Sequence, residues 1–99
     1  MPSKVEVKLR SSRWAGKRSD IDIMANILNE AHMSARKTRI MYRCNLSHRQ
    51  LATYLELLLD MEFLIIHSEK DSSNLDFFKT TTKGLKFLDA YRTLKALMT

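Results

Sequence analysis

A run of cationic side chains in the middle of the chain is the strongest chemical signal in this 99-residue sequence. No acidic residue occurs between Glu30 and Glu56. The cations of this stretch are Arg36, Lys37, Arg39, Arg43 and Arg49. Lys and Arg bind phosphate oxygens, and Arg can also donate two hydrogen bonds to a guanine edge. The pattern therefore indicates an anionic partner, most often a nucleic acid.

The distribution of charge along the chain favours the same interpretation. The formal net charge is +6 and the pI is near 9.7. Residues 1–49 carry a net charge of +7, whereas residues 50–99 carry −1. A polyanion would therefore contact the first half of the chain. On charge alone, a basic protein without such a partner fits equally well.

No pattern in the sequence is typical of a catalytic or metal-binding centre. His32, His48 and His67 have neither paired cysteines nor HExxH spacing. The two glycines stand apart, so there is no glycine-rich phosphate loop. The single cysteine, Cys44, excludes an intrachain disulfide and is expected to be a small core residue. We therefore expect no catalytic residues, no metal and no cofactor.

Two helices with a tight break between them are predicted to position the cations. The first covers about residues 38–44, and the second runs from Ser47 or His48 to about Glu62. Asn45 tolerates the left-handed backbone of a break, and Ser47 can accept hydrogen bonds from free amides at a helix start. The inward positions of the second helix are Leu51, Leu55, Leu58 and Met61, with Tyr54 beside them. This pattern predicts a helix-turn-helix.

The two halves of the second helix differ in charge. Its outward positions are His48, Arg49, Ala52 and Thr53 near the start, followed by Glu56, Asp60 and Glu62. The first half can enter a DNA groove, whereas the acidic half must stay outside it. Arg49 is the best candidate for a guanine edge, with His48 and Thr53 in support.

A preceding helix and a following hairpin complete the predicted domain. Residues 20–33 predict a helix capped by Ser19 and Asp22, with an inward face of Ile21, Met24, Ile27 and Leu28. Residues 63–67 and 75–80 are rich in aromatic and β-branched side chains and predict two strands around a polar turn. A hairpin directly after a helix-turn-helix is where a wing belongs.

The last predicted helix, residues 82–98, carries apolar side chains on more than one side. Its main stripe, spaced by four, three and four residues, consists of Phe87, Tyr91, Leu94 and Met98. We interpret this stripe as an interface with a second copy, because it extends beyond what a small domain easily covers. In the alternative, all four side chains fold back onto the helix at residues 20–33.

The N-terminal residues 1–18 form a basic leader. Its cations include Arg10, Arg13, Lys17 and Arg18. One hypothesis is an arm that lies along the phosphate backbone or in a minor groove. The alternatives are a flexible tail and a strand added to a sheet edge. Trp14 is expected to pack onto the body of the domain.

Several segments resemble one known family. They are KTRIMY at 37–42, NLS at 45–47 and TKG at 82–84, together with Tyr54, Leu55, Leu88 and Tyr91. They are similar to the archaeal winged helix-turn-helix family that includes the small dimeric Sulfolobus nucleoid proteins. The resemblance covers about residues 21–91.

The resemblance implies double-stranded DNA binding by a homodimer joined through C-terminal helices in an antiparallel coiled coil. It implies base-reading roles for Ser47, His48, Arg49 and Thr53. It implies DNA-backbone contacts for Lys37, Arg39 and Arg43, with which we group the adjacent Arg36.

The expected fold is therefore α+β. It comprises a basic arm at 1–18, a winged helix-turn-helix of three helices and a hairpin at 19–81, and a dimerisation helix at 82–99. The expected function is that of a DNA-binding homodimer, either a transcription regulator or a nucleoid-organising protein, with helix 47–62 in the major groove.

A protein–protein interaction module in a transcription complex is the alternative function. In that case Tyr42, Leu57 and the last helix would contact a partner protein. No apolar run reaches membrane-spanning length, and the N-terminus has no apolar signal core. We expect a cytoplasmic, nucleoid-associated protein without membrane contacts.

Overall fold

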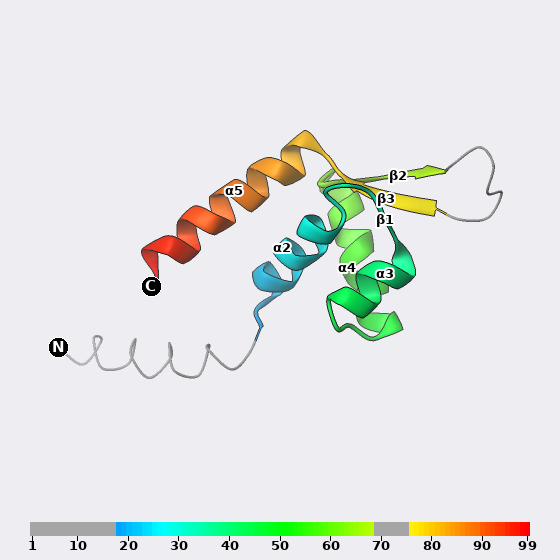
Figure 1. Ribbon diagram of the computed structural model, residues 1–99, viewed down its shortest axis with the longest axis horizontal. Coiled ribbons are helices and arrows are strands. Elements are labelled where there is room, and N and C mark those ends of the chain that lie inside the picture. Colours follow the sequence, from blue (N-terminus) through cyan, green and yellow to red (C-terminus); the bar gives the residue numbers. More distant parts are fainter. Residues whose placement is uncertain (1–17, 69–75) are drawn as a thin grey trace.

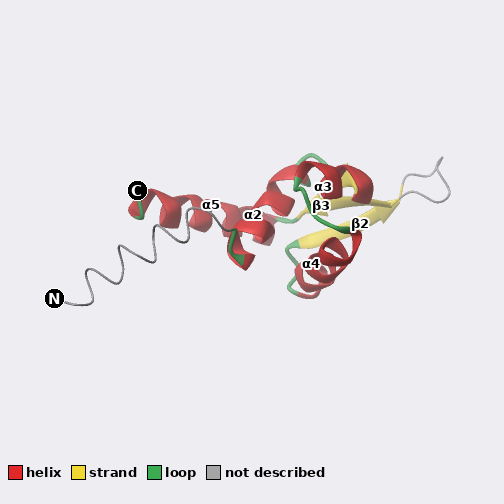
Figure 2. Ribbon diagram, turned by 90° about the horizontal axis from the view of Figure 1, so that it is seen from below, coloured by secondary structure: helices red, strands yellow, loops and turns green. Residues whose placement is uncertain are grey.

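The fold combines helices with a three-stranded antiparallel sheet. The structure is a computed structural model, which describes residues 18–68 and 76–99. Its elements are α2 (Asp20–Glu30), β1 (Ala35–Arg36), α3 (Lys37–Arg43), α4 (His48–Asp60), β2 (Leu64–Ser68), β3 (Asp76–Thr80) and α5 (Thr82–Leu97). The hairpin of β2 and β3 projects at one end, and α5 runs beside α2 at the other (Figure 1; Figure 2). This order confirms the predicted α+β winged helix-turn-helix fold.

Local side-chain signals set the starts of α2 and α4. Ser19 and Asp22 form a reciprocal capping box at α2, and Ser47 and Gln50 form another at α4. Between α3 and α4, Asn45 has a φ of 54°, in the left-handed region. These contacts confirm the predicted caps and the predicted break of the helix-turn-helix.

The start of α5 is a crowded junction with the turn that follows α4. Thr81 caps the helix by accepting a hydrogen bond from the Gly84 amide at 3.0 Å, and donates one to the Glu62 carbonyl at 2.6 Å. A Cβ atom on Gly84 would clash with the Phe63 carbonyl oxygen and lie 2.6 Å from the Thr80 Cγ2. Only glycine therefore lets α5 pack so closely on this turn.

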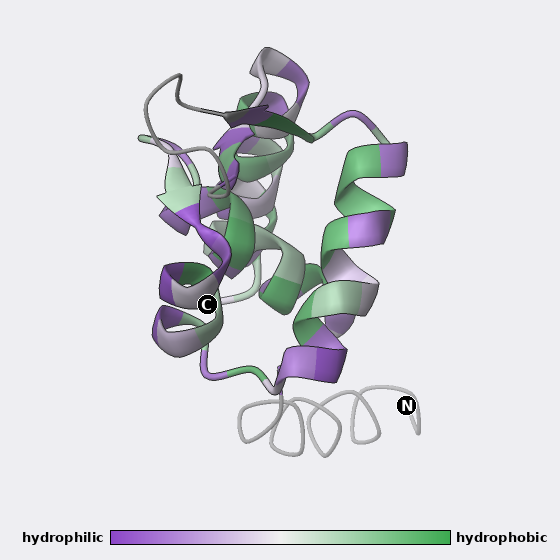
Figure 3. Cartoon of the chain, turned by 90° about the vertical axis from the view of Figure 1, so that its right-hand side faces the viewer, coloured by the Kyte–Doolittle hydropathy of each residue, from purple (hydrophilic) through white to green (hydrophobic). Residues whose placement is uncertain are grey.

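One hydrophobic core joins the helices to the sheet. Its largest fully buried side chains are Ile27, Leu28, Ile40, Leu51, Leu58 and Leu64. In Figure 3, hydrophobic and polar stretches alternate along the helices, as expected when each helix buries one face. The buried Thr80 hydroxyl donates to the Leu28 carbonyl at 2.6 Å, so the sheet and α2 are also linked by a polar contact.

The sheet has the order β1-β3-β2, and β3 pairs antiparallel with both neighbours. Arg36 on β1 lies opposite Phe77, which lies opposite His67 on β2. The sequence pattern did not predict β1. A two-residue strand is too short to show an alternating pattern.

Some predicted helix limits and core positions were wrong. α2 ends at Glu30 rather than Met33, and Ala31 is its C-cap. Ile21 and Met61 are 46% and 41% exposed. Both stand at helix ends, where fewer neighbouring elements cover a side chain. The other helix limits and the start of β2 differ from the predicted ones by two residues at most.

Candidate nucleic-acid interface

The first turns of α4 present a polar surface, and the helix is held in place by buried leucines on its inner face. Leu51 and Leu55 are buried in the core. The exposed residues of these turns include Ser47, His48, Arg49, Gln50 and Thr53. The structure thus brings all four predicted base-reading residues to one exposed helix end. Their role toward DNA stays a prediction.

These polar side chains differ in how free their donors are. The Ser47 hydroxyl accepts a hydrogen bond from the Gln50 amide at 3.1 Å, and the Thr53 hydroxyl donates to the Arg49 carbonyl at 3.2 Å. Within the described part of the chain, the side chains of His48 and Arg49 have no such partner. The Arg49 guanidinium can therefore offer all its donors to a ligand, whereas Ser47 first serves the helix.

The predicted phosphate-binding cations on α3 are partly balanced by one acid from α2. Glu30 Oε1 lies 3.9 Å from Arg39 Nε and 3.6 Å from Arg43 Nε. Both guanidinium groups remain more than half exposed. One carboxylate against two cations leaves a net positive charge on this surface. The contact joins α2 to α3, so the sequence pattern did not predict it.

The other two predicted backbone contacts flank the start of α3. Arg36 is exposed, and its guanidinium lies 5.3 Å from the centre of the Phe77 ring. Lys37 is half-buried and has no hydrogen-bond or ion-pair partner among the described residues. The four predicted phosphate contacts therefore lie on β1 and α3, immediately before the turn into α4.

Arg18 holds the turn between α3 and α4. Its guanidinium donates hydrogen bonds to the carbonyls of Cys44 and Asn45, the second at 3.2 Å. A cation at a helix C-terminus also interacts favourably with the helix dipole. The sequence places Arg18 with Arg10, Arg13 and Lys17 in a predicted arm toward DNA, whereas in the structure its side chain lies on this turn. Those three residues, like Trp14 and the predicted turn at 69–74, lie outside the described residues, so the arm stays a prediction.

Cys44 is buried, as predicted, at the end of α3. Burial raises the pKa of its thiol to about 11, and the nearby Glu30 carboxylate acts in the same direction. Because the thiolate is the reactive form of cysteine, this thiol is suited to packing rather than to chemistry.

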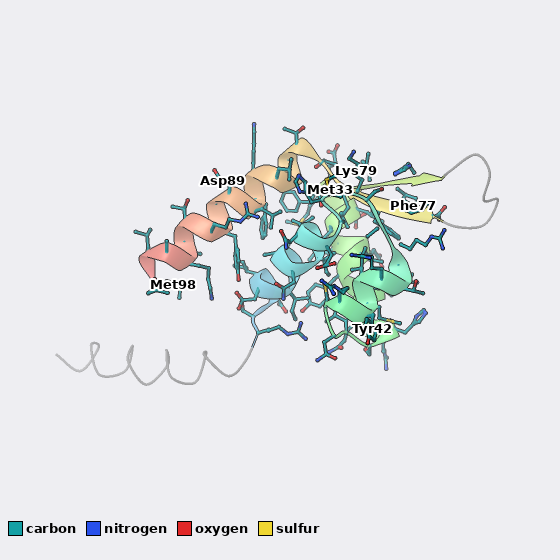
Figure 4. The ribbon with its side chains drawn as sticks, viewed as in Figure 1. Met33, Tyr42, Phe77, Lys79, Asp89 and Met98 are labelled. Atoms are coloured by element: carbon teal, nitrogen blue, oxygen red, sulfur yellow. The ribbon has the colours of Figure 1, made fainter. Side chains whose placement is uncertain are left out.

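The predicted dimer stripe on α5 divides into two parts. Phe87 packs on Phe63, with ring centroids 5.1 Å apart, and the Tyr91 hydroxyl donates a hydrogen bond to Asp22. These two residues fold back onto their own chain, which is the alternative that the sequence left open. Leu94 and Met98 remain 47% and 60% exposed, and Met98 stands near the free end of α5 (Figure 4).

Asp22 on α2 contacts Tyr91 and Lys95 and so links α2 to α5. The hydrogen bond from Tyr91 lowers the pKa of Asp22 from 3.8 to about 2; burial opposes this shift, and Ser19 and Lys95 contribute to it. Lys95 Nζ lies 3.5 Å from the carboxylate. Burial and the same hydrogen bond raise the pKa of Tyr91 to about 12.

Across residues 18–68 and 76–99, no three His, Cys, Asp or Glu side chains are grouped to hold a metal ion. In the same ranges, no helix is long and apolar enough to cross a membrane.

The fold and this exposed helix define a winged helix-turn-helix protein. The sequence matches the winged helix-turn-helix family over residues 17–99, and the chain belongs to that family. None of the curated protein sequences matches the chain.

Three solved structures illustrate the likeness. The DNA-binding protein Sso10a-2 from Sulfolobus solfataricus is 23% identical over 82% of each chain, with a TM-score of 0.69. The PcaV transcriptional regulator from Streptomyces coelicolor is 13% identical over 99% of this chain and 77% of its own, with a TM-score of 0.74. The Staphylococcus aureus MepR–DNA complex is 12% identical over 96% and 80%, with a TM-score of 0.69. These structures share the fold, and the Sulfolobus protein agrees with the archaeal resemblance.

Proposed function

We propose that this protein binds double-stranded DNA as a homodimer, with α4 in the major groove, and acts as a transcription regulator or a nucleoid-organising protein. The observation that carries the proposal is the exposed, polar first half of α4. The Arg49 side chain there has no partner among the described residues. A major groove accepts a helix whose N-terminal residues reach base edges.

The charge of α4 limits how the helix can approach DNA. Glu56, Asp60 and Glu62 follow on its second half and beyond, and all three are exposed. Phosphates would repel them, so the helix can enter a groove only by its first turns. Arg49 would then meet a guanine edge, with His48 and Thr53 on neighbouring bases.

The cations before α4 are suited to phosphate contacts, which fix the position of the protein on the duplex. Lys37 and Arg36 have no ion-pair partner among the described residues. Arg39 and Arg43 share Glu30 through Nε atoms and remain more than half exposed, so their terminal nitrogens can still reach a phosphate.

The exposed part of α5 supports dimerisation. Leu94, Leu97 and Met98 are 47%, 79% and 60% exposed. Apolar side chains at successive turns of one helix favour packing against another helix. Because Phe87 and Tyr91 are committed to their own chain, we propose an interface limited to the last turns of α5.

One observation favours the alternative of a protein-interaction module. Tyr42 on α3 is 85% exposed and Leu57 on α4 is 41% exposed. Exposed aromatic residues are frequent anchors at protein interfaces. A partner protein bound there would cover part of the surface that we assign to DNA.

The experiment that tests the proposed function is a titration of the protein on random and genomic duplexes at several salt concentrations, with its mass in solution measured alongside. A dimer with a steep salt dependence and preferred genomic sites supports a regulator. The same salt dependence without preference supports a nucleoid-organising role. A monomer, or no duplex binding at low salt, would contradict the proposal and favour the interaction module.

A further inference from the structure

A cleft of about 350 Å³ opens at the edge of the sheet, beside the end of α2 and the start of α3. Its lining includes Glu30, Met33, Ser34, Arg36, Arg39 and Phe77. Small-ligand sites commonly occupy about 300–1,000 Å³. No residue from the exposed face of α4 contributes to the cleft, so it is separate from the proposed base-reading surface.

One side of the cleft lies on a row of planar side chains. Arg36, Phe77 and His67 are paired across the three strands, so they share one face of the sheet. The Arg36 guanidinium lies 5.3 Å from the Phe77 ring centre, and the His67 ring stacks on Phe77 at 5.6 Å with an interplanar angle of 22°. Arg36 and His67 thereby hold Phe77 between them, and the part of the ring that lines the cleft is an apolar surface against which another planar group can pack edge-on.

The loop before β1 helps to keep this row in place. Ser34 has a φ of 76°, and its hydroxyl lies 2.8 Å from His67 Nε2, within hydrogen-bond distance. This contact orients the His67 ring against Phe77. The row is therefore ordered before a ligand binds, which lowers the entropic cost of binding.

An exposed methionine stands beside the row. Met33 is apolar, yet 82% of its surface is exposed. Figure 4 shows Met33 and Phe77 toward the hairpin side of the molecule, far from Met98 on α5. The flexible thioether of Met33 can close over a flat apolar group that lies on Phe77.

Positive charge exceeds negative charge around the cleft. Arg36 and Arg39 line it, and Glu30 is the single acid among the described residues that do so. The Glu30 carboxylate is already shared between Arg39 and Arg43. A guanidinium binds a carboxylate or phosphate with two parallel hydrogen bonds, so the free charge here favours an anionic ligand.

We propose that this cleft binds a planar aromatic anion, with its ring between Phe77 and Met33 and its acidic group on Arg36 and Arg39. An aromatic carboxylate and a mononucleotide share this chemistry. A consequence rests on the proposed function: the same two arginines are assigned to DNA phosphates, so the bound anion competes with a duplex.

The direct test uses the full-length protein without DNA. 2-Naphthoate and adenosine 5′-monophosphate are titrated separately by calorimetry, and amide NMR shifts locate the bound molecule. The expected result is saturable one-to-one binding of at least one probe, with shifts centred on residues 33–39 and 77. Binding of naphthoate alone identifies a carboxylate site, and binding of the nucleotide alone identifies a nucleotide site. Binding of neither at millimolar concentration, or shifts centred on α5, would overturn the proposal.

Variants distinguish binding of the probe in this cleft from nonspecific binding elsewhere on the protein. Phe77→Ala should weaken the probe roughly tenfold or more, because it removes this apolar surface. Met33→Ala, at an exposed position that cannot affect the core, should weaken it by a smaller factor. Glu30→Gln should strengthen binding, because it removes the one acid that repels the anion. Leu85→Ala, at a position on α5 that is 38% exposed and does not line the cleft, is the control and should change nothing. Unchanged affinity in both Met33→Ala and Glu30→Gln would contradict the site.

Competition is measured last, by adding the probe to a protein–duplex complex. Displacement of the duplex by wild-type protein, and weaker displacement by Met33→Ala, is the expected result. If the protein binds no duplex, the proposed function fails while the direct titration still decides whether the cleft binds the anion. If probe and duplex bind together without mutual effect, the shared use of Arg36 and Arg39 is wrong.

Discussion

At the scale of single residues, the four candidate base-reading side chains differ in whether they already have a hydrogen-bond partner within the protein. Ser47 and Thr53 have hydroxyls engaged within α4, whereas Arg49 has no partner among the described residues. A side chain with free donors can follow a base edge, while a capping hydroxyl must also satisfy the helix. Arg49 should therefore account for most sequence preference.

Arg49→Ala should lower affinity for a preferred duplex by about 1–3 kcal/mol and relax the preference at one base pair. Binding of wild-type and variant protein to a set of single-base substituted duplexes measures this effect. Arg92→Ala, which removes an equal charge from exposed α5, is the matched control. An equal loss on every sequence would assign Arg49 to the backbone instead.

Lys37→Ala should weaken all duplexes alike, because a phosphate contact carries no sequence information. The slope of log affinity against log salt should become shallower by about one. Lys86→Ala, an exposed lysine on α5, controls for the change in net charge. A slope that is the same for both variants would remove Lys37 from the interface.

Several single-residue features were predictable because they depend on near neighbours in sequence. The capping boxes at Ser19 and Ser47 and the left-handed Asn45 are of this kind. The contacts of Glu30 with Arg39 and Arg43, and of Arg18 with the end of α3, join different elements. Charge alone does not say which acid meets which cation, so these contacts could not be predicted.

At the scale of elements, the junction between the β-hairpin and α5 depends on Gly84. In Gly84→Ala the new Cβ would meet the Phe63 carbonyl oxygen and the Thr80 methyl group, and backbone cannot move away cheaply. Overpacking of this kind costs about 1–3 kcal/mol, which should exceed the roughly 1 kcal/mol that alanine gains in a helix. Urea unfolding should show a lower midpoint. Lys86→Ala on the same helix should be nearly neutral, and a Gly84→Ala variant as stable as wild type would contradict this packing.

The contact between α2 and α5 should make stability depend on acid pH. The folded-state pKa of Asp22 is about 2, below its usual 3.8, so its contribution is present above pH 3.8 and is lost as the pH falls toward 2. For a side chain that is 16% exposed, this amounts to about 1–2 kcal/mol. Asp22→Asn should flatten the stability profile between pH 4 and pH 2, whereas Asp89→Asn, at an exposed position on α5, should not. The same acid dependence in both variants would argue against the link.

The α5 stripe shows the limit of periodicity as evidence. The spacing of Phe87, Tyr91, Leu94 and Met98 correctly predicts one apolar face. It does not say which surface covers each residue. The first two lie beside α2 and Phe63, whereas the last two extend beyond them and remain exposed. The two-residue β1 was missed for a related reason, because it carries too few residues to form a pattern.

At the scale of the whole molecule, the winged helix-turn-helix order could be predicted because each element carries its own period, cap or break. Whether the protein forms a dimer depends instead on what packs against the exposed end of α5.

Leu94→Gln combined with Met98→Gln should shift the proposed dimer to a monomer without changing the charge of the protein. Sedimentation at several concentrations measures this. Leu57→Gln on α4 is the control, and loss of the dimer in that variant alone would place the interface elsewhere.

The central claim is that the first turns of α4 meet DNA, and amide NMR during titration with a short duplex tests it most directly. We expect chemical-shift changes centred on residues 36–43 and 47–53 at low salt, and these changes should disappear as the salt concentration is raised. Shifts centred on the second half of α4 and on α5, or no shifts at low salt, would contradict it.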